Sequence, residues 1–222
     1  MEITEYPSPN YNQRQTNQTP PDILVIHTMN MELSEALELL TSPAREISSH
    51  YVIATDGTIY RLVSEDCRAW HCGTGKSKWR GKDDLNSFSL GIELIRPVNS
   101  SGYPKEQIDA LTELTRSILS RFPIPARNIV GHSDIAPGRK TDPIFPFPWK
   151  DLALKGIGLW TDDFTPAAQN AESMLEAIGY DIKDLSAAIT AFQMHFLPEN
   201  VNGKADDLTL KRLSALTRIL DN

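Results

Sequence analysis

Cysteine is scarce in this chain, which has only Cys67 and Cys72 among its 222 residues. The two lie five positions apart with no second pair, a pattern that fits neither a disulfide framework nor a thiolate zinc site. We expect free thiols or, at most, one local bridge.

Long hydrophobic runs are also absent. No stretch approaches the roughly 20 apolar residues that a membrane span needs, so no transmembrane segment is predicted. Residues 1–21 are polar and contain neither the apolar core of a signal peptide nor a lipidation cysteine. If the chain is complete as given, we expect a cytoplasmic protein. If an export signal has been removed, we expect the periplasm or the outer membrane.

Clustered positive charge is the third absence. The net charge is −7 and no basic patch interrupts the acidic balance, which argues against nucleic-acid binding. With 40% hydrophobic and 23% charged residues, the composition is that of a globular protein. The length suits one large domain, or one medium domain with a smaller one.

The first 160 residues carry alternating strand and helix patterns after an extended arm at 1–21. Apolar runs and period-two alternation mark strands, Asp56-Gly57 marks a hairpin, and apolar residues at helical spacing mark helices. The predicted fold class is therefore α/β, with a mixed central β-sheet flanked by helices. Strands are expected at 23–27, 49–53, 58–62 and 89–95, with Ile129 and Val130 leading into a loop, and helices at 31–40 and 105–122.

The pattern turns irregular near residues 149–161, where Gly156 and Gly158 lie. We place a domain boundary there, giving a catalytic domain at 1–160 and a helical domain at 161–222. Three short helices are expected in the second domain, which is too small to hold a second catalytic core. They span 166–178, 186–196 and 207–220.

A candidate metal site is formed by two histidines and an aspartate. His27 ends an apolar strand, and His132 lies in a segment whose prolines and glycines are expected to exclude regular helix and strand. Asp134 and Asp142 compete for the carboxylate position, and Asp134 could instead be an N-cap or a partner of the imidazole. Two histidines and one aspartate leave a fourth zinc position open, the usual catalytic arrangement. The pattern predicts a metallohydrolase.

Two charged residues could act beside that metal. Glu93 lies in an apolar strand, where a carboxylate is costly unless it is paired. It is either a salt-bridge partner, for example of Arg96 or Lys140, or a general base. Lys140 is either a surface lysine or an ammonium that stabilises a developing oxyanion.

Three further histidines are less informative. His50 and His71 either line the site or are ordinary polar residues, and His195 in the helical tail is expected to be structural.

Five sequence blocks occur in a definite order between residues 24 and 143. The blocks are Leu24-Val25-Ile26-His27, Ser48-Ser49-His50-Tyr51, Arg68-Ala69-Trp70-His71, Ser89-Leu90-Gly91-Ile92-Glu93-Leu94, and Gly131-His132-Ser133-Asp134-Ile135-Ala136-Pro137 continuing to Arg139-Lys140-Thr141-Asp142-Pro143. With these blocks, the chain resembles the zinc-dependent N-acetylmuramoyl-L-alanine amidases related to peptidoglycan recognition proteins, in the AmpD/AmiD branch. The resemblance covers residues 6–155.

The resemblance implies roles for five residues. His27, His132 and Asp142 would bind Zn²⁺, while Glu93 and Lys140 would be the catalytic glutamate and lysine. The implied reaction cleaves the amide between N-acetylmuramic acid, or its anhydro form, and L-alanine of the stem peptide. The implied partners are peptidoglycan or muropeptides, in cell-wall turnover or recycling.

The resemblance also extends to the tail. Residues 174–213 resemble the three-helix peptidoglycan-binding module that AmiD-type enzymes have and AmpD-type enzymes lack. Asn202-Gly203-Lys204-Ala205-Asp206 belongs to this match, although the usual Gly-x-x-Thr is replaced by a longer spacing to Thr209. The tail would either anchor the enzyme to insoluble wall or pack on the catalytic domain and stabilise it.

Substrate contacts and rival functions complete the expectations. Trp70 offers an apolar face for a sugar ring, and Arg139 a fork for stem-peptide carboxylates. Alternatively, they are a core tryptophan and a surface arginine. The rival functions are a protein that binds peptidoglycan fragments without catalysis, which should lack some of these residues, and a stem-peptide metallopeptidase.

Overall fold

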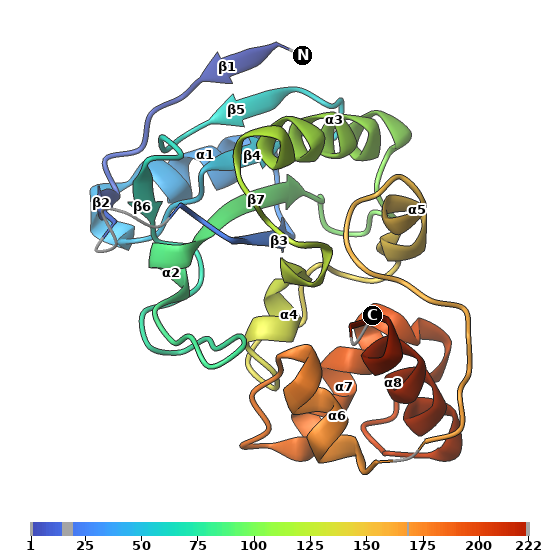
Figure 1. Ribbon diagram of the computed structural model, residues 1–222. Helices are drawn as coiled ribbons and strands as arrows, with labels where there is room; N and C mark the ends of the chain where they lie inside the picture. Colours follow the sequence, from blue (N-terminus) through green and yellow to red (C-terminus); the bar gives the residue numbers. More distant parts are fainter. Residues whose placement is uncertain (1, 15–19, 168, 221–222) are drawn as a thin grey trace.

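A computed structural model describes residues 2–14, 20–167 and 169–220, and its centre is a six-stranded mixed sheet (Figure 1). The strand order is β1-β5-β4-β7-β3-β8, and β4 with β5 is the antiparallel pair. A separate antiparallel pair joins β2 to β6. The strands are β1 Ile3–Glu5, β2 Tyr11–Gln13, β3 Ile23–Met29, β4 Tyr51–Ile53, β5 Ile59–Arg61, β6 Cys67–Ala69, β7 Ser89–Ile95 and β8 Ile129–Gly131.

The described helices follow the sequence pattern closely in the long segments. The α-helices are α1 Leu33–Thr41, α2 Leu85–Phe88, α3 Lys105–Arg121, α4 His132–Ile135, α5 Trp149–Leu154, α6 Ala171–Ile178, α7 Leu185–Phe196 and α8 Asp207–Leu220. Short 3₁₀ helices occupy Pro43–Arg45, Ala126–Asn128 and Pro198–Asn200. Among the described residues, no helix is long and apolar enough to cross a membrane.

The two longest strands, β3 and β7, lie side by side in parallel at the middle of the sheet. Nearly every residue of both is buried, as expected of central parallel strands covered on both faces. Their register pairs His27 with Glu93. Two polar residues predicted to share a site are therefore neighbours across one ladder.

One face of the sheet is covered by α3 and α5. Leu90, Ile92 and Leu94 of β7 pack there with Leu24 and Ile26 of β3. These side chains meet the apolar stripe of α3 and the buried residues of α5. This face is entirely apolar at its centre.

The opposite face is divided between two apolar clusters. Toward one end, Met29 and Ile95 pack with the buried side of α1. Toward the other end, Ile23, Val25 and Val130 pack with α4 and the tail helices. His27 and Glu93 lie on this face between the two clusters, because they alternate with Leu24, Ile26, Ile92 and Leu94 along their strands.

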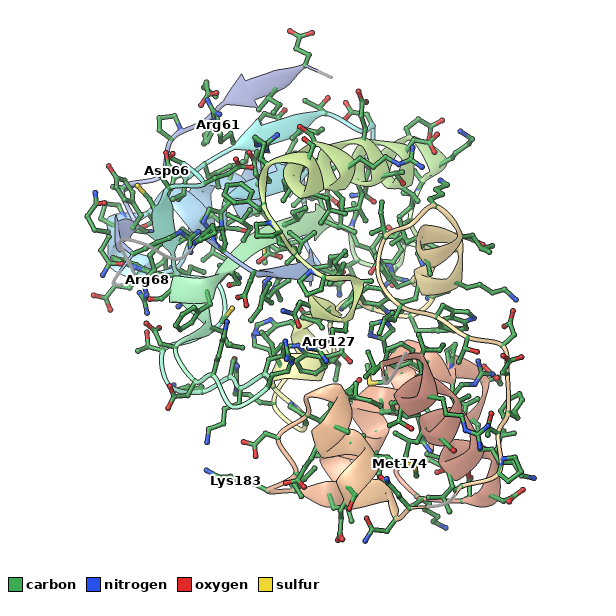
Figure 2. The ribbon with its side chains drawn as sticks, in the orientation of Figure 1. Arg61, Asp66, Arg68, Arg127, Met174 and Lys183 are labelled. Atoms are coloured by element: carbon green, nitrogen blue, oxygen red, sulfur yellow. The ribbon has the colours of Figure 1, made fainter. Side chains whose placement is uncertain are left out.

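The helical tail lies against this second face through one continuous cluster. Figure 1 shows α6, α7 and α8 grouped at one end of the molecule, with α4 between them and the sheet. Side chains fill the junction, and Met174 of α6 is buried among the tail helices (Figure 2). The apolar core of the tail is therefore shared with the sheet, and the division at residue 160 stays a prediction.

Several expectations about local structure need correction. The expected boundary region contains α5, which packs under the sheet. The described part of the N-terminal arm is extended but paired, since β1 joins β5 and β2 joins β6. Elements of three to six residues such as β6, α2 and α5 show too little periodicity to be found from sequence. Cys67 and Cys72 are both free thiols, one of the two expected states.

Candidate metal centre

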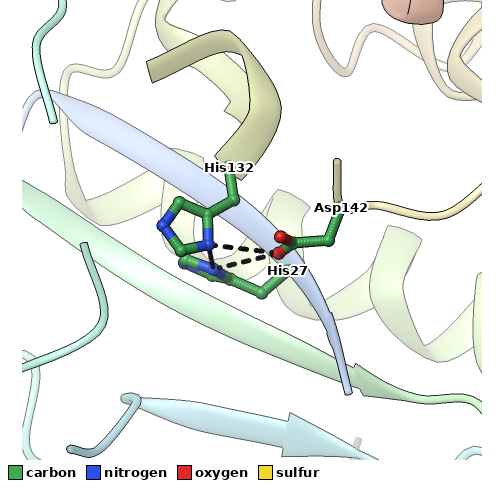
Figure 3. Close-up of side chains that lie close together, drawn as sticks. All are labelled: His27, His132 and Asp142. Atoms are coloured by element: carbon green, nitrogen blue, oxygen red, sulfur yellow. Dashed lines mark hydrogen bonds and ion pairs between the residues drawn. The ribbon is translucent and has the colours of Figure 1, made fainter. Parts of the chain in front are cut away.

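His27, His132 and Asp142 converge on one point, as Figure 3 shows. The two Nδ1 atoms of His27 and His132 are 2.9 Å apart, and Asp142 Oδ2 lies 3.5 Å and 3.2 Å from them. In a tetrahedral zinc site with bonds of about 2.0–2.1 Å, ligand atoms lie about 3.3 Å from one another. The donor set and its spacing therefore fit a zinc ion.

Three separate elements supply these ligands. His27 is near the end of β3, and His132 is the first residue of α4, directly after β8. Asp142 returns to them because Ser133 N donates to its backbone oxygen at 2.8 Å. A Cβ on Gly131 would lie 2.6 Å from Pro143 Cδ, so only glycine permits this close approach.

The segment after β8 was expected to exclude regular helix, yet α4 forms one turn there. The helix begins at His132 because Gly131 N donates to Asp134 Oδ2 at 2.7 Å, which satisfies a donor at the helix start. The helix ends at Ile135, before Pro137 and Gly138, so these two residues do not prevent it from forming.

The protonation states of the residues in this cluster favour metal binding at neutral pH. Burial is the main cause that lowers the pKa of His132 to about 4, and proximity to His27 adds to it. Burial alone would raise the pKa of Asp142, but hydrogen bonds from His132 and His27 bring that pKa far below its usual range. At neutral pH an unprotonated imidazole and an ionised carboxylate face the same point, which are the states that bind metal.

Glu93 borders the cluster from β7. Its Oε1 lies 4.0 Å from His27 Nδ1. Burial raises the pKa of Glu93 to about 7; Asp142 also raises it, while His27 and Lys140 lower it. Of the two salt-bridge partners suggested for Glu93, Arg96 instead donates from Nη2 to Ser100 O at 2.7 Å.

A cleft passes over the cluster. Two hollows of about 490 and 290 Å³ share Ile47, Trp70, His71, His132 and Lys140 along their walls. Arg139 lines the larger one, and Glu93 and Asp142 line the smaller. The structure thus brings both predicted catalytic residues and three of the four predicted substrate contacts to one cavity.

The fourth predicted contact, His50, is elsewhere. It is fully buried behind His71, where its Nδ1 accepts from Gly91 N at 3.0 Å and its Nε2 lies 3.1 Å from Cys67 O. The ring of His71 covers this position, so the His50 side chain does not reach the cleft. The sequence pattern indicated a strand at His50 but did not indicate which side chains would cover its ring.

His71 itself contacts a candidate ligand. Its Nδ1 lies 2.9 Å from His27 Nε2, and its Nε2 lies 3.2 Å from Ser89 Oγ. A Cβ on Gly91 would lie 2.7 Å from the His71 ring, so the glycine of β7 makes room for it. His71 both lines the cleft and supports the ring of His27.

Other cleft residues were missed from sequence. Asn12, Lys76 and Asn86 line the larger hollow. Trp70 Nε1 donates to Asn12 Oδ1 at 3.0 Å, which fixes the indole at the cleft wall. These residues come from a short edge strand, a loop and a one-turn helix, and no local motif marks them.

Asp134, the other candidate carboxylate, faces away from the cluster. It is fully buried and accepts hydrogen bonds from Tyr180 and His195 of the tail. It is the third residue of α4 rather than its N-cap, which is Gly131, and the imidazole that it holds is His195 rather than His132. His195 was expected to be structural, and its burial and this contact agree.

Comparison with known proteins points to one family. A family model described as N-acetylmuramoyl-L-alanine amidase matches residues 17–145. The N-acetylmuramoyl-L-alanine amidase AmiD of Escherichia coli is 37% identical over 228 residues, covering 87% of this chain and 81% of the relative. The 1,6-anhydro-N-acetylmuramyl-L-alanine amidase AmpD of the same organism is 35% identical over 161 residues, covering 64% and 86%.

Solved structures show the same similarity over nearly the whole chain. AmpDh3 from Pseudomonas aeruginosa in complex with anhydromuramic pentapeptide has a TM-score of 0.80 at 34% identity, covering 96% of this chain and 95% of that one. The E. coli AmiD complex with anhydro-N-acetylmuramic acid-L-Ala-D-gamma-Glu-L-Lys has a TM-score of 0.76 at 34% identity, covering 96% and 98%. The similarity includes the helical tail.

Proposed function

The chain belongs to the N-acetylmuramoyl-L-alanine amidase family, and we propose that it hydrolyses the amide between N-acetylmuramic acid and L-alanine with a zinc ion held by His27, His132 and Asp142. The observation that carries the zinc assignment is the convergence of three ligand atoms within 4.8 Å, beside a buried glutamate in a cleft. A zinc ion bound there would activate water and polarise the carbonyl of the substrate.

Glu93 acts as the general base and then as the general acid. Its carboxylate takes a proton from the attacking water and delivers it to the alanine nitrogen as the C–N bond breaks. Burial raises the pKa of Glu93 to about 7 in the metal-free protein, and the charge of a bound zinc ion would favour the carboxylate form that accepts the proton. Its position opposite His27 keeps it beside the metal ligands.

Lys140 stabilises the negative charge that develops on the carbonyl oxygen. It lies two residues before Asp142 and lines both hollows of the cleft. An ammonium in a partly buried site interacts more strongly with an oxyanion than it would in water. It therefore favours the transition state over the neutral amide.

The cleft walls suit a muropeptide. Trp70 would pack on the sugar ring, and the Arg139 guanidinium would bind a stem-peptide carboxylate. Arg139 is held in place because its Nη2 donates to Cys72 O at 3.0 Å and to Ser77 Oγ at 2.7 Å. We propose an anhydromuropeptide as a substrate, because two similar structures hold one.

The residues of this chemistry all lie before residue 160. We assign catalysis to residues 1–160 and leave residues 161–222 without a chemical step. A relative that covers 64% of the chain, AmpD, is itself an amidase, which supports this division.

Product analysis of a purified muropeptide tests the reaction. Incubation with anhydro-N-acetylmuramyl peptide, followed by mass spectrometry, should yield the free sugar acid and a peptide with an alanine N-terminus. Cleavage within the stem peptide would instead indicate a metallopeptidase. Tight binding without any product would indicate a protein that only binds wall fragments.

A further inference from the structure

Two side chains of the helical tail hydrogen-bond to a carboxylate two residues from a proposed metal ligand. Tyr180 Oη donates to Asp134 Oδ1 at 2.7 Å, and His195 Nδ1 donates to Asp134 Oδ2 at 2.7 Å. Gly131 N donates to the same Oδ2 at 2.7 Å. The tail is therefore joined through one buried carboxylate to the backbone that immediately precedes His132.

A second route runs through stacked rings. His195 stacks on Trp149 with ring centroids 3.8 Å apart and an interplanar angle of 19°. Trp149 in turn packs on Gly131, since a Cβ there would lie 3.3 Å from Trp149 Cζ2 and 2.6 Å from Pro143 Cδ. Pro143 follows Asp142 directly, so this route leads to both loop ligands.

The tail holds the neighbouring loop as well. Lys78 N donates to Ile135 O at 2.8 Å, and Arg80 N donates to Gly179 O at 2.9 Å. Trp79 packs edge-on against Tyr180 with ring centroids 5.1 Å apart. The loop between β6 and α2 thus bridges α4 and the tail beside the Tyr180 contact.

By contrast, the turn of the tail that resembles a peptidoglycan-binding motif is saturated by its own contacts. The Gln193 side chain bonds Asn202, Gly203, Lys204 and Thr209. Asp206 accepts from the side chains of Asn200, Asn202 and Thr209. These groups stabilise the turn itself, whereas Tyr180 and His195 hydrogen-bond to a residue outside the tail.

We propose that Tyr180 and His195 are positioning residues that hold His132 and Asp142 in the arrangement that binds metal. The inference rests on the proposed metal site and adds a role for the tail in it. Asp134 is fully buried, so loss of the Tyr180 hydroxyl leaves Oδ1 without a donor, and loss of His195 leaves Oδ2 with Gly131 N as its remaining donor. The Asp134 carboxylate would then move toward water. The start of α4 would shift with it and displace His132.

Zinc affinity of full-length variants tests the proposal. Tyr180→Phe removes one donor and keeps the ring, and His195→Phe removes the other while keeping an aromatic ring for the stack. Affinity is measured by competition with a chromophoric chelator, and the Co²⁺-loaded proteins are compared by visible absorption, which reports coordination geometry. We expect zinc to bind about 10- to 100-fold more weakly in each variant, the scale for residues that support metal ligands, with an altered Co²⁺ spectrum.

Two control variants separate positioning from general destabilisation. Tyr51→Phe also removes a tyrosine–carboxylate hydrogen bond, the partly buried 2.8 Å contact with Glu65 on the other side of the sheet. Leu213→Ala opens a cavity in α8 without touching Asp134. Both should lower the melting temperature but keep wild-type zinc affinity and the wild-type Co²⁺ spectrum.

The outcomes are distinct for the two proposals. Zinc affinity in Tyr180→Phe equal to wild type, or a loss no larger than in Leu213→Ala, overturns the positioning role. A wild-type protein that binds no zinc overturns the proposed metal site and the positioning role together. If His195→Phe does not fold, Tyr180→Phe decides the matter alone, because it removes one oxygen atom only.

Discussion

The two faces of the central sheet are built from the same strands, but only one of them carries buried histidines and a glutamate between its apolar clusters. On β7, Leu90, Ile92 and Leu94 pack under α3, while Gly91 and Glu93 alternate with them toward the cleft. One face stabilises the fold by burying apolar surface. The other buries histidines and a carboxylate, which cost stability. A rigid apolar face therefore supports a face that is chemically useful but unfavourable to bury.

The largest effect on the turnover number is expected from substitution of Glu93. Glu93→Gln removes the proton acceptor and keeps the shape, so the turnover number should fall about 10²- to 10⁴-fold. The folded structure and zinc content should be unchanged. Steady-state kinetics with a muropeptide, alongside metal analysis, measure both. Near-normal turnover would show that Glu93 is not the general base and only packs on this face of the sheet.

Lys140 should show a somewhat smaller effect. Lys140→Ala removes a charge that matters mainly when the oxyanion develops, so the turnover number should fall about 10²- to 10³-fold with little change in KM. Lys150→Ala, which removes the same charge from the exposed side of α5, is the matched control. A rise in KM at constant turnover would show instead that Lys140 only binds substrate.

The apolar face should respond in the opposite way. Leu94→Ala, next to Glu93 on β7, should destabilise the fold by about 2–5 kcal/mol through lost burial and a cavity. Turnover by the remaining folded enzyme should stay within about twofold of wild type, since the altered side chain faces α3. Urea unfolding and kinetics at low temperature measure the two quantities. A large loss of turnover without a loss of stability would contradict the division between the faces.

The smallest expected effect is the contribution of His50 to the pH dependence of the free energy of unfolding. Burial is the main cause that lowers the pKa of His50 to about 3, so the folded protein keeps this imidazole neutral while the unfolded chain protonates it near pH 6.5. Its stabilising contribution is therefore complete above pH 6.5 and is lost as the pH falls from there toward 3. The slope is at most about 1.4 kcal/mol per pH unit for one group.

The variant His50→Asn isolates this contribution. Asparagine can place an oxygen near the Nδ1 position, where Gly91 N still finds an acceptor. Urea unfolding of the metal-free protein between pH 7 and pH 5 should show a shallower decline for the variant than for wild type. Parallel declines would mean that His50 gives up its neutral state more readily than its burial implies.

Much of this arrangement could be predicted from sequence, and the exceptions have physical causes. Apolar patterns and helical periodicity predicted β7 and α8 with their observed bounds, and placed His27 and Glu93 on apolar strands. The link from Asp134 to His195 spans 61 positions and depends on how the tail packs, which no local pattern specifies. His50 was misplaced because its neighbourhood in sequence does not show which ring covers it.

The central claim is that His27, His132 and Asp142 together hold one zinc ion that the reaction requires. Exhaustive chelation followed by metal analysis and titration with Zn²⁺ measures this directly, with His132→Ala as the comparison. We predict that chelation removes activity and that one equivalent of zinc restores it in wild type, whereas His132→Ala neither binds the ion tightly nor recovers. Full activity in protein shown to contain no metal would contradict the account.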